Sequence, residues 1–259
     1  MEFWYLFPVG LTIASVGMSS GVSGSNFWIP IYLLGMGLDP RVAFWASLLT
    51  LLFGFGSGVL RNLRAGTVSG PLLARSLAAA GPMACLGAVA SNHLPVDGLL
   101  TAFAAFAGAY GIALLLPASG GGDSPQQRRW FPRVVALTAG ALQGAIATGA
   151  GALLMPSLLK DEKISHHAEA IGTTVTAVFT LSLISVVFRI DAALWVALQD
   201  HGDALLEMMT FAVPGVVIGG QVGPRIAQRL PRRWLRRYVG ALLVVVGCLV
   251  ALRLIGGGS

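Results

Sequence analysis

The sequence predicts an all-α fold, a polytopic helical membrane protein, and three observations carry this prediction. Of the 259 residues, 55% are hydrophobic and only 11% are charged, whereas a soluble globular domain carries about 25% charged residues. Apolar runs of about 20 residues, enough to cross the hydrocarbon core of a bilayer, follow one another along the chain. The 17 basic residues lie mostly between these runs, where membrane proteins place them. Together these observations exclude a soluble enzyme, a disordered chain and a nucleic-acid-binding protein, although the net charge is +6.

Six apolar runs have the length of a single membrane crossing. They are 42–60, 77–89 with its flanks, 99–116, 170–188, 208–222 and 238–252. Two other runs do not fit one crossing, because 3–38 is too long and 134–159 is interrupted near its end by Pro156. Glycines break both of them, so we expect two hairpins in which a helix enters, the chain unwinds and a shorter helix returns. Such irregular backbone is tolerated at membrane depth only where protein or a water-filled cavity covers it.

The two halves of the chain resemble each other. Residues 23–30 (SGSNFWIP) align with 149–156 (GAGALLMP), and Pro82 and Gly87 align with Pro214 and Gly219. We therefore expect two copies, each a broken-helix hairpin followed by three transmembrane helices. The predicted division is 1–118 for the first transmembrane repeat, 119–132 for a polar cytoplasmic linker, 133–255 for the second repeat, and 256–259 for a flexible linker or cloning remnant.

The charges predict that these two repeats are inverted. Arg61 and Arg64 follow the second segment of the first copy, whereas the equivalent loop of the second copy holds Asp191, Asp200 and Asp203. Because arginine-rich loops stay in the cytoplasm, the equivalent loops are expected on opposite sides of the membrane. The copies would then be related by a pseudo-two-fold axis in the membrane plane, an architecture common among secondary transporters.

The second copy carries a recognisable motif. It consists of Gly149-Ala150-Gly151, four apolar positions followed by Pro156, and then Ala170-Ile171-Gly172-Thr173-Thr174. The pattern resembles the sulfite exporter TauE/SafE family, also called the toluene sulfonate uptake permease family. The first copy departs from it, with Ser23-Gly24-Ser25 in place of the glycine triplet and Trp45-Ala46-Ser47 in place of Gly-Thr-Ser. The stretch from Pro214 to Pro231 is similar to the family's seventh-segment signature, so the resemblance covers nearly the whole chain.

The resemblance implies a transporter of the bacterial or archaeal inner membrane, surrounded by lipid. Its partner would be a small sulfur-containing anion, such as sulfite, sulfoacetate or a related organosulfonate. We therefore expect no enzyme activity, no cofactor and no nucleic acid. The direction of transport, a coupling ion (H⁺ or Na⁺) and the oligomeric state stay open.

The two glycine-rich breaks are the expected substrate site. Helix N-termini offer unpaired N–H groups and a partial positive charge to an anion, and glycine lets a ligand approach the backbone. Inverted repeats would aim both returning half-helices at the membrane midplane. The expected substrate-binding residues are Ser23, Gly24, Ser25, Asn26, Ser47, Thr148, Gly149, Ala150, Gly151, Thr173 and Thr174.

Other residues near the breaks have secondary expectations. Gln143, Gln221 and Thr50 are expected to line the cavity, and the glutamines have the alternative of bonding a neighbouring helix. Pro30 and Pro156 are expected to mark the helix breaks and fix their geometry. The pairs Gly17 and Gly21, and Gly140 and Gly144, have the spacing of closely packed transmembrane helices.

Two alternatives remain at this stage. A passive anion channel would show flux far too fast for alternating access. An intramembrane serine protease is more distant: Gly17-Met18-Ser19-Ser20-Gly21 matches the string G-x-S-x-G. The 4 histidines, however, fall in loops or at helix ends, so none is placed to act as a buried base. His166 and His167 are adjacent and lack the one-face spacing of a helical metal pair, so no metal site is expected.

Overall fold

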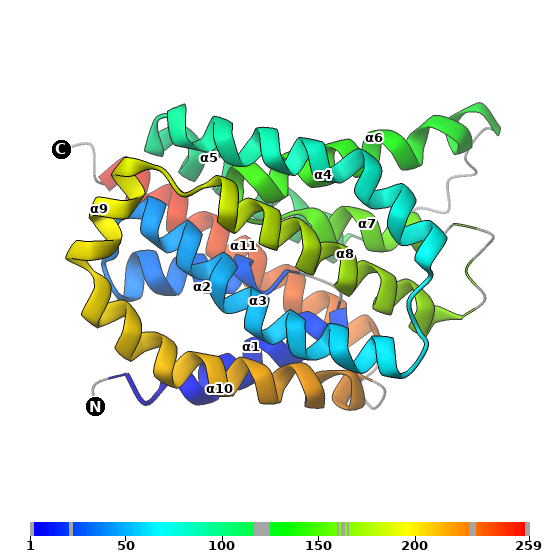
Figure 1. Cartoon of the computed structure of the whole chain (residues 1–259), viewed down its shortest axis with the longest axis horizontal. Coiled ribbons are helices and arrows are strands. Elements are labelled where there is room, and N and C mark those ends of the chain that lie inside the picture. Colours follow the sequence, from blue (N-terminus) through cyan, green and yellow to red (C-terminus); the bar gives the residue numbers. More distant parts are fainter. Residues whose placement is uncertain are drawn as a thin grey trace.

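The computed structural model describes residues 3–20, 23–116, 125–159, 161, 164, 166–227 and 232–256. The regular structure within these ranges is helical (Figure 1). The elements are α1 (Leu6–Ser20), α2 (Ser25–Pro30), the π-helix η1 (Ile31–Gly35), α3 (Pro40–Arg64), α4 (Gly70–His93), α5 (Val96–Leu115), α6 (Pro125–Ile146), α7 (Ala150–Leu159), α8 (His167–Phe188), α9 (Ala192–Asp200), α10 (Gly202–Ala227) and α11 (Arg232–Gly256).

Six of the described helices, α3, α4, α5, α8, α10 and α11, are long and apolar enough to cross a membrane. Each corresponds to one of the six predicted crossings, so that prediction is confirmed. Both predicted hairpins are also present. The first is α1 followed by α2 and η1, and the second is α6 followed by α7.

Local sequence explains several helix starts. Pro40 occupies the first turn of α3, where a missing N–H costs nothing, and the Asp39 carboxylate accepts the Arg41 N–H at 2.8 Å. The Asp191 carboxylate likewise accepts the Leu194 N–H at 2.7 Å and starts α9. The helix α9 was not predicted, because the sequence suggested only a loop between the crossings at 170–188 and 208–222.

Three further differences concern the hairpins and the linker. Neither proline lies at a break: Pro30 ends α2 and is followed directly by η1, and Pro156 lies inside α7. The described parts of the breaks precede them, at 23–24 and 147–149, which corrects the prediction that the prolines mark the breaks. In addition, α6 begins at Pro125, inside the segment 119–132 that the sequence predicts as a linker.

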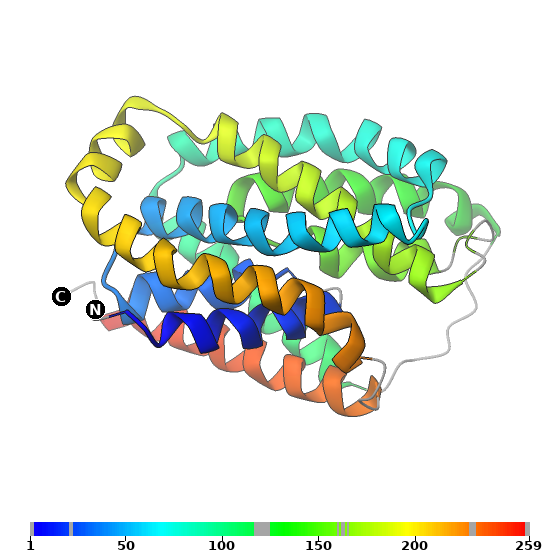
Figure 2. The same cartoon turned by 60° about the horizontal axis from the view of Figure 1, so that its bottom comes forward.

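The helices of one half pair mainly with those of the other. Helix α1 lies along α10, α4 along α6, and α5 along α11, while α3 packs against both α8 and α10 (Figures 1 and 2). Two such pairs depend on glycine: a Cβ on Gly140 or Gly144 would overlap the α4 backbone, and a Cβ on Gly215 would overlap the backbone of α1. The packing interpretation of Gly140 and Gly144 is confirmed, whereas Gly21 lies outside the described residues.

The connections divide by charge between the two ends of the bundle. The α3–α4 connection, the end of α10 and the start of α6 lie at one end, and the α4–α5 and α8–α9 connections lie at the other (Figure 1). The first end follows Arg61 and Arg64, and the second carries Asp191. We call the first the inner end and the second the outer end, following the positive-inside rule.

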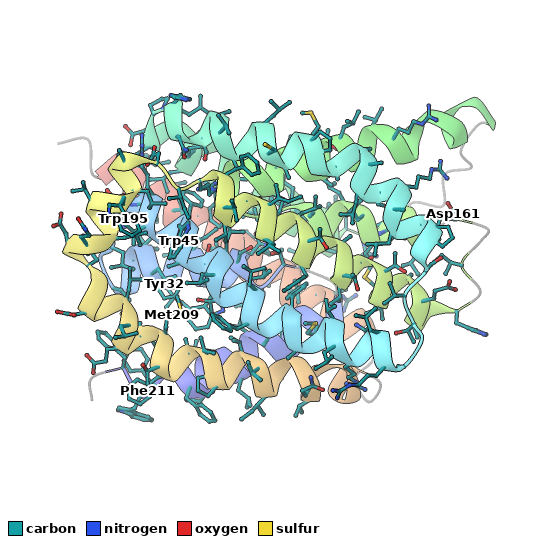
Figure 3. All side chains as sticks on the ribbon, in the orientation of Figure 1. Tyr32, Trp45, Asp161, Trp195, Met209 and Phe211 are labelled. Atoms are coloured by element: carbon teal, nitrogen blue, oxygen red, sulfur yellow. The ribbon has the colours of Figure 1, made fainter. Side chains whose placement is uncertain are left out.

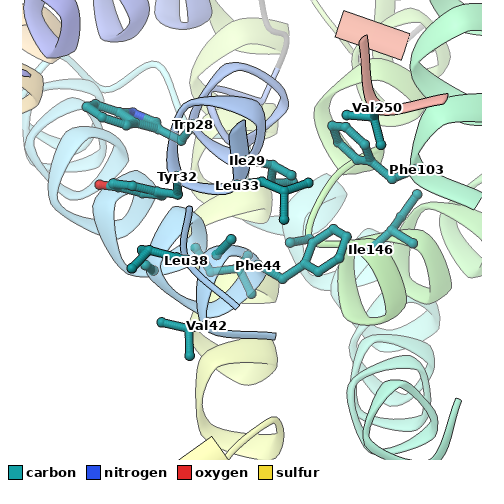
Figure 4. Close-up of a cluster of buried hydrophobic side chains, with 14 of the residues drawn as sticks. Trp28, Ile29, Tyr32, Leu33, Leu38, Val42, Phe44, Phe103, Ile146 and Val250 are labelled. Carbon is teal, nitrogen blue, oxygen red and sulfur yellow. The ribbon is translucent and has the colours of Figure 1, made fainter. Parts of the chain in front are cut away.

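The returning helix α2 is embedded in the largest apolar core. All six of its residues are buried. Trp28 stacks on Tyr32 with ring centroids 5.1 Å apart, and Phe44 meets Phe103 edge to face at 6.0 Å. Figure 4 shows this cluster, which also includes Ile146 from the end of α6. The core therefore holds both helix breaks deep inside the protein.

Candidate substrate site at the two helix breaks

The two breaks, 126 residues apart in the alignment of the repeats, meet directly. The Ser25 hydroxyl donates to the Ala147 carbonyl at 2.5 Å, and the Thr148 hydroxyl donates to the Asn26 side-chain oxygen, also at 2.5 Å. All four residues are fully buried. The sequence-predicted groups at 23–26 and 148–151 thus form a single polar cluster between the hairpins.

The first break folds through its own side chains. The hydroxyls of Ser23 and Ser25 share a hydrogen bond of 2.6 Å, and the Asn26 amide donates to the Ser23 carbonyl at 3.1 Å. Serine and asparagine bond nearby backbone in this way and so favour turns over continuous helix. Gly24 precedes α2 with ordinary helical angles, φ −61° and ψ −22°.

The second break depends instead on unusual backbone. Ala147 has φ 58° and Gly149 has φ 100°. Glycine adopts such angles freely, but alanine pays a steric cost. The chain then enters α7, whose first N–H, that of Ala150, is held by the Gln143 side-chain oxygen at 3.4 Å. The Gln143 amide also donates to Ser182 of α8 at 2.9 Å, so Gln143 belongs to the cluster.

Several other predicted site residues are buried but bond their own helices. The hydroxyl of Ser47 donates to the Phe44 carbonyl, and that of Thr174 donates to the Ala170 carbonyl, both at 2.7 Å. Thr50 donates to Ala46 and pairs with the Tyr32 hydroxyl at 2.7 Å. None of the hydrogen bonds described for these three residues joins them to the breaks.

Two predicted residues are engaged elsewhere. The Thr173 hydroxyl accepts the Ser69 N–H at 2.9 Å, in the α3–α4 connection at the inner end. The Gln221 amide donates to the Ser57 carbonyl of α3 at 2.6 Å. Of the two roles that the sequence left open for Gln221, the structure therefore favours bonding a neighbouring helix over lining a cavity.

Sequence reasoning missed Arg189. The residue is only 4% exposed, and its side chain donates to the carbonyls of Gly144, at 2.9 and 3.1 Å, and Ala145, at 2.6 Å. Those carbonyls end α6 just before the second break, where a cation complements the helix dipole. Burial, with a smaller contribution from the charge of Arg41, lowers the pKa of Arg189 to about 9. The feature of the sequence that could have identified Arg189 is that it is a lone arginine in an otherwise acidic loop.

The polar cluster is closed in this conformation. Among the described residues, every buried side-chain nitrogen and oxygen has a hydrogen-bond partner.

Two small cavities lie toward the ends of the bundle. The inner cavity, about 30 Å³, is lined by α4, α6 and α7 and includes Arg75, Arg133 and Asp161, while the outer cavity, about 10 Å³, includes Arg41, Arg189 and Asp191. Neither is lined by a residue of the breaks. Figure 3 labels Asp161 at the inner end.

Comparison with known proteins identifies the family. Residues 6–250 match the sequence model described as "Sulfite exporter TauE/SafE". The chain belongs to the TauE/SafE family. A curated relative, "Probable membrane transporter protein YunE" of Bacillus subtilis (strain 168), is 22% identical over 274 residues, covering 96% of this chain and 97% of the relative. No solved structure gives a significant match.

Family membership turns several expectations into findings. The chain is a multi-pass membrane protein of a transporter family, which in bacteria places it in the inner membrane. The family implies a small anionic substrate and a lipid environment, and it favours a non-enzymatic function. The match gives no support to the serine protease alternative. No group of three or more His, Cys, Asp or Glu that could hold a metal occurs within the described part of the chain.

Proposed function

We propose that this protein is a secondary transporter that moves a small sulfur-containing anion, such as sulfite, sulfoacetate or a related organosulfonate, across the inner membrane. The substrate would be held near the midplane between the two helix breaks. The sulfur-anion class rests on the family match over 6–250. The location rests on one observation: the breaks of two separate hairpins are bonded to each other through Ser25, Asn26, Ala147 and Thr148.

The chemistry of the cluster suits an oxyanion. Sulfite and sulfonate oxygens accept hydrogen bonds, and the cluster supplies donors from the hydroxyls of Ser25 and Thr148 and the amide of Asn26. In the closed state these three donors point at protein oxygens, namely the Ala147 carbonyl, the Asn26 side-chain oxygen and the Ser23 carbonyl. Binding then consists of replacing those acceptors with substrate oxygens, without placing a fixed charge at the centre of the membrane.

The proposed mechanism is alternating access between two inverted repeats. It is supported by the pairing of helices across the halves, because α1 with α10 and α6 with α4 are the same contact with the repeats exchanged. The chain directions of α3 and α8 also support it: these equivalent helices of the two repeats run in opposite directions in Figure 1, as inverted repeats require. Each hairpin contributes one side of the cluster, so movement of one hairpin relative to the other would open the site.

The test is anion flux into proteoliposomes, comparing sulfoacetate, sulfite, sulfate and chloride, for wild type and for Thr148→Val. A matched control is Thr138→Val, the same change on α6 at an exposed hydroxyl that bonds only the carbonyls of Val134 and Val135. We expect saturable uptake of a sulfur anion that Thr148→Val reduces at least tenfold and Thr138→Val leaves unchanged.

Each part of the proposal has its own contrary result. Absence of flux for every sulfur anion, in protein shown to be folded, would refute the proposal that the substrate is a sulfur-containing anion. Equal flux in both threonine variants would refute the proposal that the substrate binds at the helix breaks. Flux that does not saturate and is not stimulated by anion on the opposite side would favour the passive channel.

A further inference from the structure

The outer cavity is lined by two arginines and one aspartate. Arg41 lies in the first turn of α3, Arg189 directly follows α8, and Asp191 precedes α9, so three elements bring these charges together. Ser91 and Asn92, at the end of α4, add polar side chains to the lining. Two guanidinium groups face one carboxylate, which leaves a local excess of positive charge at the otherwise acidic outer end.

The ion pair inside this cavity is loose. The Arg41 Nη1 and Asp191 Oδ2 atoms are 3.8 Å apart, beyond hydrogen-bond distance, and both side chains are about 30% exposed, at 30% and 29%. Exposed pairs of this kind contribute little to stability. The other oxygen of Asp191 is committed to capping α9 through the Leu194 N–H. The carboxylate can therefore leave Arg41 while it remains the cap of the helix.

Arg189 links the cavity to the polar cluster. One part of its side chain lines the cavity, while Nε and Nη2 bond the carbonyls of Gly144 and Ala145. These carbonyls lie two or three residues before Ala147 in the second break. One buried side chain therefore joins the outer cavity to the end of α6.

We propose that the outer cavity is a second anion site, separate from the helix breaks, in which a small oxyanion binds between Arg41 and Arg189 by displacing the Asp191 carboxylate. The Asp191 carboxylate then competes with the anion for the arginines, and it keeps the cavity closed when no anion is present. The inference rests on the proposed function for the class of ligand, since the anion at this site is the transported one on its way between the outer solution and the breaks.

The inner cavity carries the same set of charges and supplies a control. Arg75 Nη1 and Asp161 Oδ2 are 3.7 Å apart, and Arg133 lines the same space. An aspartate-to-asparagine change can thus be made at either end. Asparagine caps helices about as well as aspartate, so Asp191→Asn removes the competing charge and keeps the start of α9.

The experiment measures half-saturation for sulfoacetate separately from each face, in right-side-out and inverted membrane vesicles. We expect Asp191→Asn to lower the outer half-saturation concentration about two- to fivefold, and Arg41→Gln to raise it by a similar factor, the range that exposed ion pairs contribute. Asp161→Asn should leave the outer value unchanged. Unchanged outer values in both outer variants, with transport intact, overturn the second site and leave the proposed function standing.

A binding measurement separates this proposal from the transport proposal. Purified protein in lipid-free detergent is heated with sulfoacetate, with sulfate or with chloride, and the thermal shift is recorded for wild type, Asp191→Asn and Arg41→Gln. An oxyanion-dependent shift that increases in Asp191→Asn and decreases in Arg41→Gln supports the site even if no flux is found, and excludes a lipid headgroup as the occupant. An identical shift in all three proteins overturns it.

Discussion

The two helix breaks meet at one polar cluster, yet the first break supplies mainly side-chain groups and the second mainly backbone groups. The first break and the start of α2, residues 23–26, contribute side chains: two serine hydroxyls and an asparagine amide, on backbone that is close to helical at Gly24. The second contributes backbone: Ala147 and Gly149 have positive φ, and the buried Ala147 carbonyl accepts the Ser25 hydroxyl. Ser25, one of the two serines that replace glycines of the triplet in the first copy, thus provides a donor to the backbone that the second copy unwinds.

The largest expected effect comes from one alanine substitution made at each break. Gly149 has φ 100° and an added Cβ would lie 3.0 Å from the Leu142 Cβ, whereas at Gly24, with φ −61°, the nearest atom, on Ile13, is 3.5 Å away. We expect Gly149→Ala to cost about 1–3 kcal/mol of stability, the range for strained backbone. Gly24→Ala should be nearly neutral. Thermal unfolding in detergent measures both, and equal losses would mean that the breaks are equivalent.

Removal of one serine hydroxyl should have an intermediate effect that depends on its partner. Ser25→Ala leaves the buried Ala147 carbonyl without its donor, which costs about 1–2 kcal/mol. Ser23→Ala removes only the shared bond to Ser25 and should cost less. The comparison uses the same unfolding assay. If Ser23→Ala proves the more destabilising variant, the dependence of the second break on the first is refuted.

The smallest expected effect is a stabilisation. Ala147→Gly relieves a left-handed conformation that costs alanine about 1–2 kcal/mol, but glycine adds about 0.5–1 kcal/mol of chain entropy to lose on folding. The net gain is up to about 1 kcal/mol. Ala150→Gly, the same change at the first residue of α7, should instead be destabilising. A lower unfolding temperature for Ala147→Gly than for wild type would contradict the backbone account.

The local features of the fold were predictable from the sequence. The six crossings follow from the length and hydropathy of single segments, and the hairpins at 3–38 and 134–159 follow from glycines that no continuous apolar helix requires. The residues of the two breaks were also identified, since Ser23–Asn26 and Thr148–Gly151 interrupt otherwise apolar runs. In each case the physical cause acts within about 20 residues.

Features that depend on a partner far along the chain were not predictable. The role of Arg189 depends on the carbonyls of Gly144 and Ala145, and that of Gln221 depends on Ser57, 164 residues away. Thr173 carries the family's motif, yet its hydroxyl serves the α3–α4 connection because packing of α8 against α3 brings Ser69 to it.

The sequence by itself determined that the chain crosses the membrane, where it unwinds and which family it belongs to, because hydropathy, helix-breaking residues and motif spacing are local properties. Only the tertiary structure decided that the two breaks share one buried cluster, and which polar groups satisfy each other there. The physical reason is that a buried hydroxyl or carbonyl must find a partner wherever the fold places one, and side chains such as Ser25 and Arg189 can bond any carbonyl that packing brings within reach.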